Sequence, residues 1–167
     1  MILLTTNLFK KEFSNINNNY SINTFASNNN NTATSLLTAS TSNQYEISIA
    51  INCLANIATK DLAQYCISDI LTLMNHTSPY IRKKSILTMY KLYMKYPQGL
   101  RITFDKLKDK LDDPDISVVS TAVNVICELS NKNPKNYLSM APKFFKLLTT
   151  TSNNWMLIKI VKLLGKL

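Results

Sequence analysis

A capping residue followed by proline marks the start of three predicted helices in this chain. The pairs are Ser78-Pro79, Asp113-Pro114 and Asn133-Pro134, and each precedes apolar residues that recur at helical spacing. Ser, Asp and Asn side chains accept hydrogen bonds from the free N–H groups of a first helical turn. Proline is tolerated there because its missing N–H has no partner at that position. The repeated pair therefore predicts a chain built from successive helices.

The segment from Pro79 to Pro97 carries the best-defined of these helices, because a second proline ends it. Its predicted inward residues are Ile86, Met89, Tyr90 and Tyr93, with Leu87 and Met94 widening the apolar arc. The opposite face is predicted to carry Lys84, Thr88, Lys91 and Lys95. A wide apolar arc suits a helix that has neighbours on more than one side, although an amphipathic helix of an ordinary bundle would show a similar pattern.

Two later helices have apolar stripes of the same kind. The helix after Pro114 is predicted to turn inward Val118, Val119, Ala122, Val125, Ile126 and Leu129. The last helix opens near Asn154 and is predicted to turn inward Trp155, Ile158, Val161 and one of Leu163 and Leu164.

Helix-turn-helix units begin near Gln44, Pro79, Pro114 and Asn154. Their spacing of about 35 to 40 residues is that of stacked helical repeats. The predicted fold class is therefore all-α, an α-solenoid of HEAT/armadillo-like helical repeats.

The composition divides the chain into three segments. Residues 1–13 are predicted to contain a short helix, and residues 44–167 to form the helical repeats. Between them, residues 14–43 are rich in Asn, Ser and Thr and nearly uncharged, so we expect a disordered insertion that cannot bury enough apolar surface to order itself. The chain ends at Leu167 within a helical pattern, which predicts that it is truncated relative to a longer solenoid.

The sequence offers little for catalysis or cofactor binding. With two glycines it lacks Gly-rich phosphate loops, and its single histidine, His76, is expected near a helix end, where a cation or hydrogen-bond donor is favourable. The carboxylates of Asp112, Asp113 and Asp115 are predicted to cap a helix rather than bind a metal. We predict no enzyme activity, no metal site and no cofactor. The cysteines Cys53, Cys66 and Cys127 are expected to be buried, reduced thiols.

The net charge of +9 permits binding to nucleic acid, to an anionic membrane or to an acidic protein, and does not choose among them. No arginine-rich run or zinc-finger spacing supports nucleic acid. A basic face is predicted on the helix after Pro79, as a candidate site for anionic lipid or a partner chain, from Arg82, Lys83, Lys84, Lys91 and Lys95. A solvated face without a ligand would give the same pattern.

Three stretches resemble the large adaptin subunits of the heterotetrameric clathrin-adaptor complexes. PYIRKK, from Pro79 to Lys84, is similar to adaptins in general. The stretches from Asn124 to Leu148 and from Asn153 to Leu167 most resemble the delta adaptins of adaptor protein complex 3. The similarity is dense over residues 44–167 and departs from the family at residues 14–43.

This resemblance implies a trunk of helical repeats that scaffolds a sigma-type small subunit within a tetramer with beta-type and mu-type subunits. It further implies recruitment by an Arf-family GTPase, a peripheral, cytoplasmic position on Golgi and endosomal membranes, and transport toward lysosome-like organelles. The alternatives are another helical-repeat scaffold, such as a nuclear transport receptor or coatomer-type subunit, and a nucleic-acid-binding repeat supported by charge alone.

Overall fold

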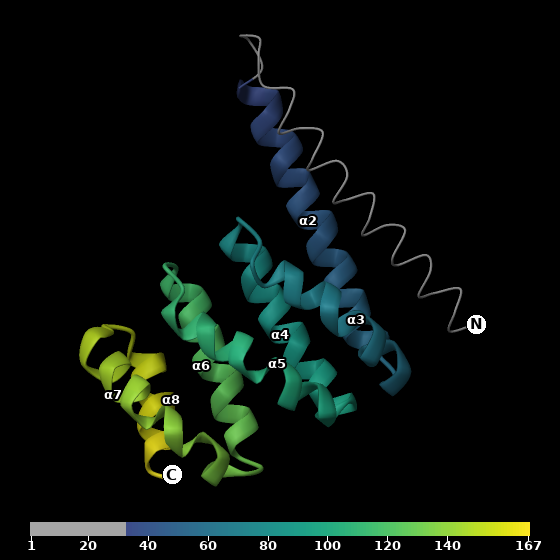
Figure 1. The fold of residues 1–167 in the computed structure, drawn as a ribbon. Helices are drawn as coiled ribbons and strands as arrows, with labels where there is room; N and C mark the ends of the chain where they lie inside the picture. The colour runs from purple at the N-terminus through teal and green to yellow at the C-terminus, as the bar shows by residue number, and fades with distance from the viewer. Residues whose placement is uncertain (1–32) are drawn as a thin grey trace.

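The structure is a computed structural model that describes residues 33–167, with side chains from residue 44 onward. Every regular element in this part of the chain is helical (Figure 1). The elements are α2 (Ala33–Ile57), α3 (Lys60–Leu73), α4 (Pro79–Lys95), α5 (Pro97–Asp109), η1 (Lys110–Asp112), α6 (Ile116–Ser130), η2 (Pro134–Met140), α7 (Ala141–Thr150) and α8 (Asn154–Leu164). The described residues thus confirm the all-α prediction.

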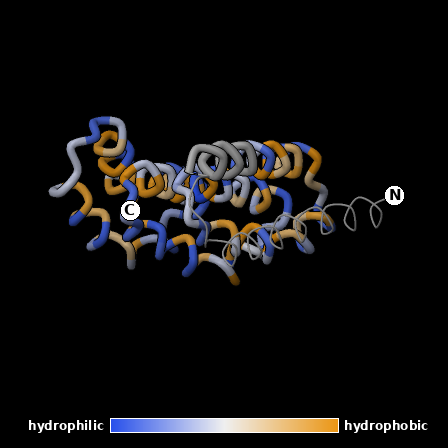
Figure 2. The backbone as a smooth tube through the Cα atoms, turned by 90° about the horizontal axis from the view of Figure 1, so that it is seen from above, coloured by the Kyte–Doolittle hydropathy of each residue, from blue (hydrophilic) through white to orange (hydrophobic). Residues whose placement is uncertain are grey.

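The helices form two layers. In one layer α2, α4, α6 and α8 pack side by side in that order, and in the other α3 and α5 lie against α4, while α7 lies against α8. Figure 2, viewed from above, shows the layers as two rows. The turns after α2, α4 and α6 lie along one edge of the molecule, where the C-terminus also lies (Figure 1). This is the predicted α-solenoid, in which each unit packs on the next.

The apolar stripe of α6 forms the middle of the core. All six side chains predicted to turn inward from α6 are buried, and Ile126 is fully buried. Because α4 and α8 flank α6 on opposite sides, a wide apolar arc is what this position requires.

The three predicted pairs of a capping residue and a proline do not start their helices in the same way. Ser78 and Pro79 do precede α4, but the Ser78 hydroxyl donates to Gln44 Oε1 at 3.1 Å instead of capping its own helix. Helix α6 begins at Ile116, after the predicted Asp113-Pro114 start, and its cap is Asp115. Asn133 and Pro134 open the 3-10 segment η2, so the α-helical turns of this unit begin only at Ala141.

Several predicted inward residues are exposed. Leu87 and Met94 reach solvent, whereas Thr88, predicted to be outside, is buried. Most of the predicted inward face of α8 is wrong: Trp155 is 75% exposed, and Ile158 and Val161 are exposed as well, although Leu163, one of the two predicted alternatives, is buried. The buried residues of α8 are Met156, Ile160 and Leu163. Helix α8 packs mainly on α6 and α7, and its apolar residues extend around the helix, so their spacing does not select which of them become buried.

Helix α2 begins at Ala33, before the predicted boundary at Gln44. Ala33, Leu36, Leu37 and Ala39 are better helix formers than the asparagines that precede them, which accounts for the earlier start. The helix predicted within residues 1–13 and the rest of the insertion, up to residue 32, lie outside the described residues. They remain predictions.

Candidate interaction surfaces

The three aspartates at the end of η1 and in the turn before α6 make three separate structural contacts. Asp112 pairs with Lys143, and Asp113 pairs with Arg82 at 2.9 Å. Asp115 caps α6 by accepting from the backbone N–H of Ser117 at 2.8 Å. The hydroxyl and backbone hydrogen bonds from Ser117 hold the pKa of Asp115 below its usual value. Capping is therefore confirmed for Asp115, and the described residues contain no cluster of His, Cys, Asp or Glu suited to a metal ion.

Arg82, the first residue of the predicted basic face, points into the protein. Its Nη1 donates to the carbonyl oxygens of His76 and Thr77 at 2.9 and 2.8 Å, and its Nη2 pairs with Asp113. Its side chain is 11% exposed and that of Asp113 is 3% exposed. Arg82 thus ties the end of α3 to the starts of α4 and α6, and its guanidinium is not available to a lipid or to a partner surface.

The four lysines of the predicted face lie at different depths on α4. Lys83 and Lys84 are half-buried, and Lys84 Nζ lies 5.7 Å from the centroid of the Tyr80 ring. Lys91 and Lys95 are exposed, and Lys91 Nζ donates to Asn56 Oδ1 of α2 at 2.9 Å. Their helical spacing places Lys84, Lys91 and Lys95 on one face, with Lys83 about 100° away around the helix.

His76 accepts a hydrogen bond through Nδ1, whereas the sequence predicted a cation or a hydrogen-bond donor near a helix end. Its Nδ1 accepts from the backbone N–H of Ser78 at 3.0 Å. Burial, followed by the charge of nearby Arg82, lowers the pKa of His76 below its ordinary value. Both causes favour the neutral imidazole, which is the form that can accept at Nδ1.

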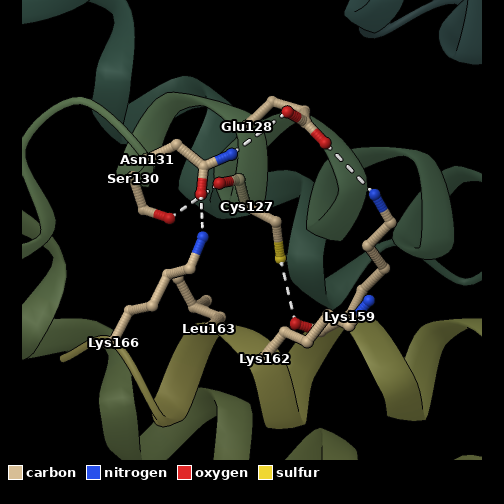
Figure 3. Close-up of a pocket in the computed structure, with 8 residues that line it drawn as sticks. All are labelled: Cys127, Glu128, Ser130, Asn131, Lys159, Lys162, Leu163 and Lys166. Carbon is tan, nitrogen blue, oxygen red and sulfur yellow. Dashed lines mark hydrogen bonds and ion pairs between the residues drawn. The ribbon is translucent and has the colours of Figure 1, made fainter.

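Polar contacts between successive repeats recur at a fixed separation. Lys91 bonds to Asn56, Lys110 to Asn75 and Lys166 to Asn131, and each pair is separated by 35 residues. Figure 3 shows the last of these pairs, in a groove between α6 and α8 where Lys159 also pairs with Glu128 at 3.1 Å. These lysines bridge neighbouring helices, so part of the positive charge serves the stacking of the repeats.

In the same groove, the thiol of Cys127 donates to the backbone carbonyl of Lys159 at 3.5 Å. Burial raises the pKa of this thiol to about 11. Cys66 is also buried, but Cys53 is exposed, contrary to expectation. None of these three cysteines forms a disulfide.

A second groove, which sequence reasoning missed, runs between the α4–α5 turn and the α6–η2 turn. It contains two adjoining hollows of about 240 and 230 Å³ that share Leu100, Arg101, Asn136 and Tyr137. Because the walls of this groove come from separate repeats, no local sequence motif predicts it. The only sequence signal is the recurrence of an aromatic or aliphatic residue near each turn.

Two layers of stacked helices, joined by polar contacts between repeats, define a helical-repeat scaffold. Among the described residues, no helix is both long and apolar enough to cross a bilayer. The model of the family described as the Adaptin N terminal region matches residues 32–167, and the chain belongs to this family.

Individual relatives narrow the similarity to one kind of adaptin. The chain is 58% identical over 128 residues to the AP-3 complex subunit delta-1 of Bos taurus, covering 77% of this chain and 11% of the relative. It is 56% identical over 127 residues to the AP-3 complex subunit delta of Dictyostelium discoideum, covering 75% of this chain and 11% of the relative. The chain therefore spans about a tenth of the length of these relatives.

The fold is similar to that of a chain in an AP-3 complex. A chain from a homology model of the full-length AP-3 complex in an intermediate open conformation aligns with a TM-score of 0.73 and 39% identity. The alignment covers 99% of this chain and 25% of the other. The sequence comparisons support the resemblance to delta adaptins, and the fold comparison supports a resemblance to a chain of an AP-3 complex.

Proposed function

We propose that this chain acts as trunk repeats of a delta-type large subunit in a heterotetrameric adaptor complex. The observation that carries the proposal is the 58% identity to an AP-3 delta subunit across most of the described repeats. The role is scaffolding: stacked repeats present an extended surface to other proteins, and no reaction is assigned to the chain.

The proposed partners are those of such a tetramer. They are a sigma-type small subunit, a beta-type large subunit and a mu-type medium subunit, with recruitment by an Arf-family GTPase. The complex would lie peripherally on the cytoplasmic side of Golgi and endosomal membranes and direct vesicle transport toward lysosome-like organelles.

Co-purification tests this proposal. An affinity-tagged full chain is expressed in its own cell type and its partners are identified by mass spectrometry. We expect sigma-type, beta-type and mu-type adaptor chains, and we expect Ile126→Asp to lose them, because burying an unpaired charge at a fully buried position unfolds the repeats. Recovery of nuclear transport or coatomer components from the folded wild type, without adaptor subunits, would contradict the assignment.

The basic face of α4 is a second part of the proposal, supported by its exposed charge. With Arg82 committed to the interior, the face consists of Lys84, Lys91 and Lys95. A lysine close to an anionic leaflet contributes about 1 kcal/mol. Three lysines therefore supply weak attraction that assists recruitment by a GTPase and does not replace it.

A further inference from the structure

The groove between the α4–α5 and α6–η2 turns is apolar inside. Leu100 and Phe104 of α5 pack against the core from one side, and Tyr137 of η2 closes the other. Phe104 and Tyr137 meet edge to face, with ring centroids 5.4 Å apart and planes at 79°. These rings form an aromatic wall of the hollow of about 230 Å³, which is large enough to receive a bulky side chain.

A tyrosine hydroxyl lines this apolar interior. Tyr137 is 4% exposed and lines both hollows, yet its hydroxyl has no hydrogen-bond partner among the described residues. The neighbouring Tyr93 differs: its hydroxyl lies 2.6 Å from Thr103 Oγ1, which itself donates to the Gly99 carbonyl at 2.8 Å. Tyr93 must therefore be the donor in its pair. The Tyr137 hydroxyl is not committed to a protein partner in the described part of the chain, so it can donate to an acceptor supplied by a ligand in the groove.

The rim of the groove is positive. Arg101 and Lys132 line the larger hollow from its two sides, and both are exposed. Arg101 has no hydrogen-bond or ion-pair partner in the described part of the chain, and Lys132 Nζ contacts only the Met94 sulfur, at 3.4 Å. The residues that line the two hollows include no Asp or Glu. The groove therefore combines unneutralised cations with an apolar interior.

We propose that this groove docks an acidic peptide segment that carries one aromatic anchor. The aromatic side chain would enter the smaller hollow against Phe104 and Tyr137, while carboxylates of the peptide would lie beside Arg101, which lines both hollows, and Lys132, which lines the larger one. The Tyr137 hydroxyl would donate to a peptide carbonyl. A bare phosphate or lipid headgroup would use the cations and leave the aromatic hollow empty, so a peptide fits the observations better. This binding does not depend on assembly into an adaptor complex.

The test uses the full chain and a fluorescein-labelled peptide with one phenylalanine flanked by glutamates. We expect fluorescence anisotropy to show saturable binding at low salt. A version with glutamine for glutamate, and one with glycine for phenylalanine, should each bind about tenfold more weakly, since a truncated anchor or a lost charge pair typically costs on the order of tenfold. Equal binding of all three peptides would overturn the proposal.

Variants locate the binding. Arg101→Glu combined with Lys132→Glu should weaken binding by about tenfold or more. The matched control, Lys106→Glu with Lys146→Glu, changes net charge equally at exposed lysines outside the groove and should shift affinity by less than about twofold. Tyr137→Phe removes one hydroxyl and keeps the ring, and should weaken binding about threefold with an unchanged circular dichroism spectrum. Equal effects of the two charge variants would refute the groove as the site.

Two other possible occupants of the groove would give different results in these experiments. If the wild type self-associates in sedimentation velocity, the groove variant is monomeric and the peptide does not compete, then the groove is an interface between copies. If the peptide does not bind but vesicles containing phosphatidylserine do, and only the groove variant loses them, then the occupant is a lipid headgroup. Either result overturns the peptide proposal.

Discussion

Replacing Arg82 by Met should destabilise the repeats far more than replacing an exposed lysine. The Met side chain keeps the packed stem and removes the guanidinium, which leaves the Asp113 carboxylate, 3% exposed, without its cation. Breaking a buried ion pair from one side costs about 3–5 kcal/mol. The carbonyls of His76 and Thr77 lose their charged donor as well. Against a typical total stability of about 5–15 kcal/mol, this loss brings the domain close to unfolding.

The chain provides a matched control for this substitution. Lys143 pairs with Asp112 across the same 31-residue separation as Arg82 and Asp113, but its side chain is 37% exposed and that of Asp112 is 64% exposed. Lys143→Met should therefore cost less than about 1 kcal/mol.

Urea unfolding followed by circular dichroism measures both values, and the double variant Arg82→Met with Asp113→Ala completes a thermodynamic cycle. We expect the double variant to lose at least about 1 kcal/mol less than the sum of its two single variants, because no buried charge is left unpaired. The reasoning fails if Arg82→Met costs no more than Lys143→Met, or if the two single losses simply add.

Three further outcomes follow from the structure. Burial and Arg82 lower the pKa of His76 in the folded state, so the unfolded chain binds the proton more readily and the melting temperature should fall as the pH drops below the ordinary histidine pKa of 6.5. His76→Asn should flatten this pH dependence, since the chain has no other histidine. Iodoacetamide at mildly alkaline pH should label exposed Cys53 within minutes and spare Cys127, whose pKa is raised to about 11; peptide mapping that finds Cys127 labelled equally fast would contradict this order. In an assembled complex, flotation on anionic vesicles at low salt should fall when glutamine replaces all of Lys84, Lys91 and Lys95, and unchanged flotation with intact assembly would remove the membrane role of this face.

The sequence was sufficient to predict the features that depend on one helix or one turn. Each predicted repeat helix after residue 44 is present, and the α6 stripe is buried as expected because α6 has neighbours on both sides. The same reasoning failed for α8, where apolar residues occur around the helix and only contact with α6 and α7 decides which are covered. Helical periodicity identifies an apolar arc but gives no information on how many neighbours will cover it.

The candidate sites depend on a different kind of information. Arg82 occurs in a run of basic residues and was therefore assigned to the surface, yet its partner, Asp113, lies 31 residues away in the next repeat. The groove likewise needs Leu100 and Tyr137 to meet across two turns. Because polar contacts between neighbouring repeats join residues 31 to 38 positions apart, such pairs become predictable once the repeat register is known. In a protein of stacked helices, a charged residue can therefore be assigned to the surface only after the positions one repeat away have been checked. An oppositely charged residue there can form a buried ion pair with it.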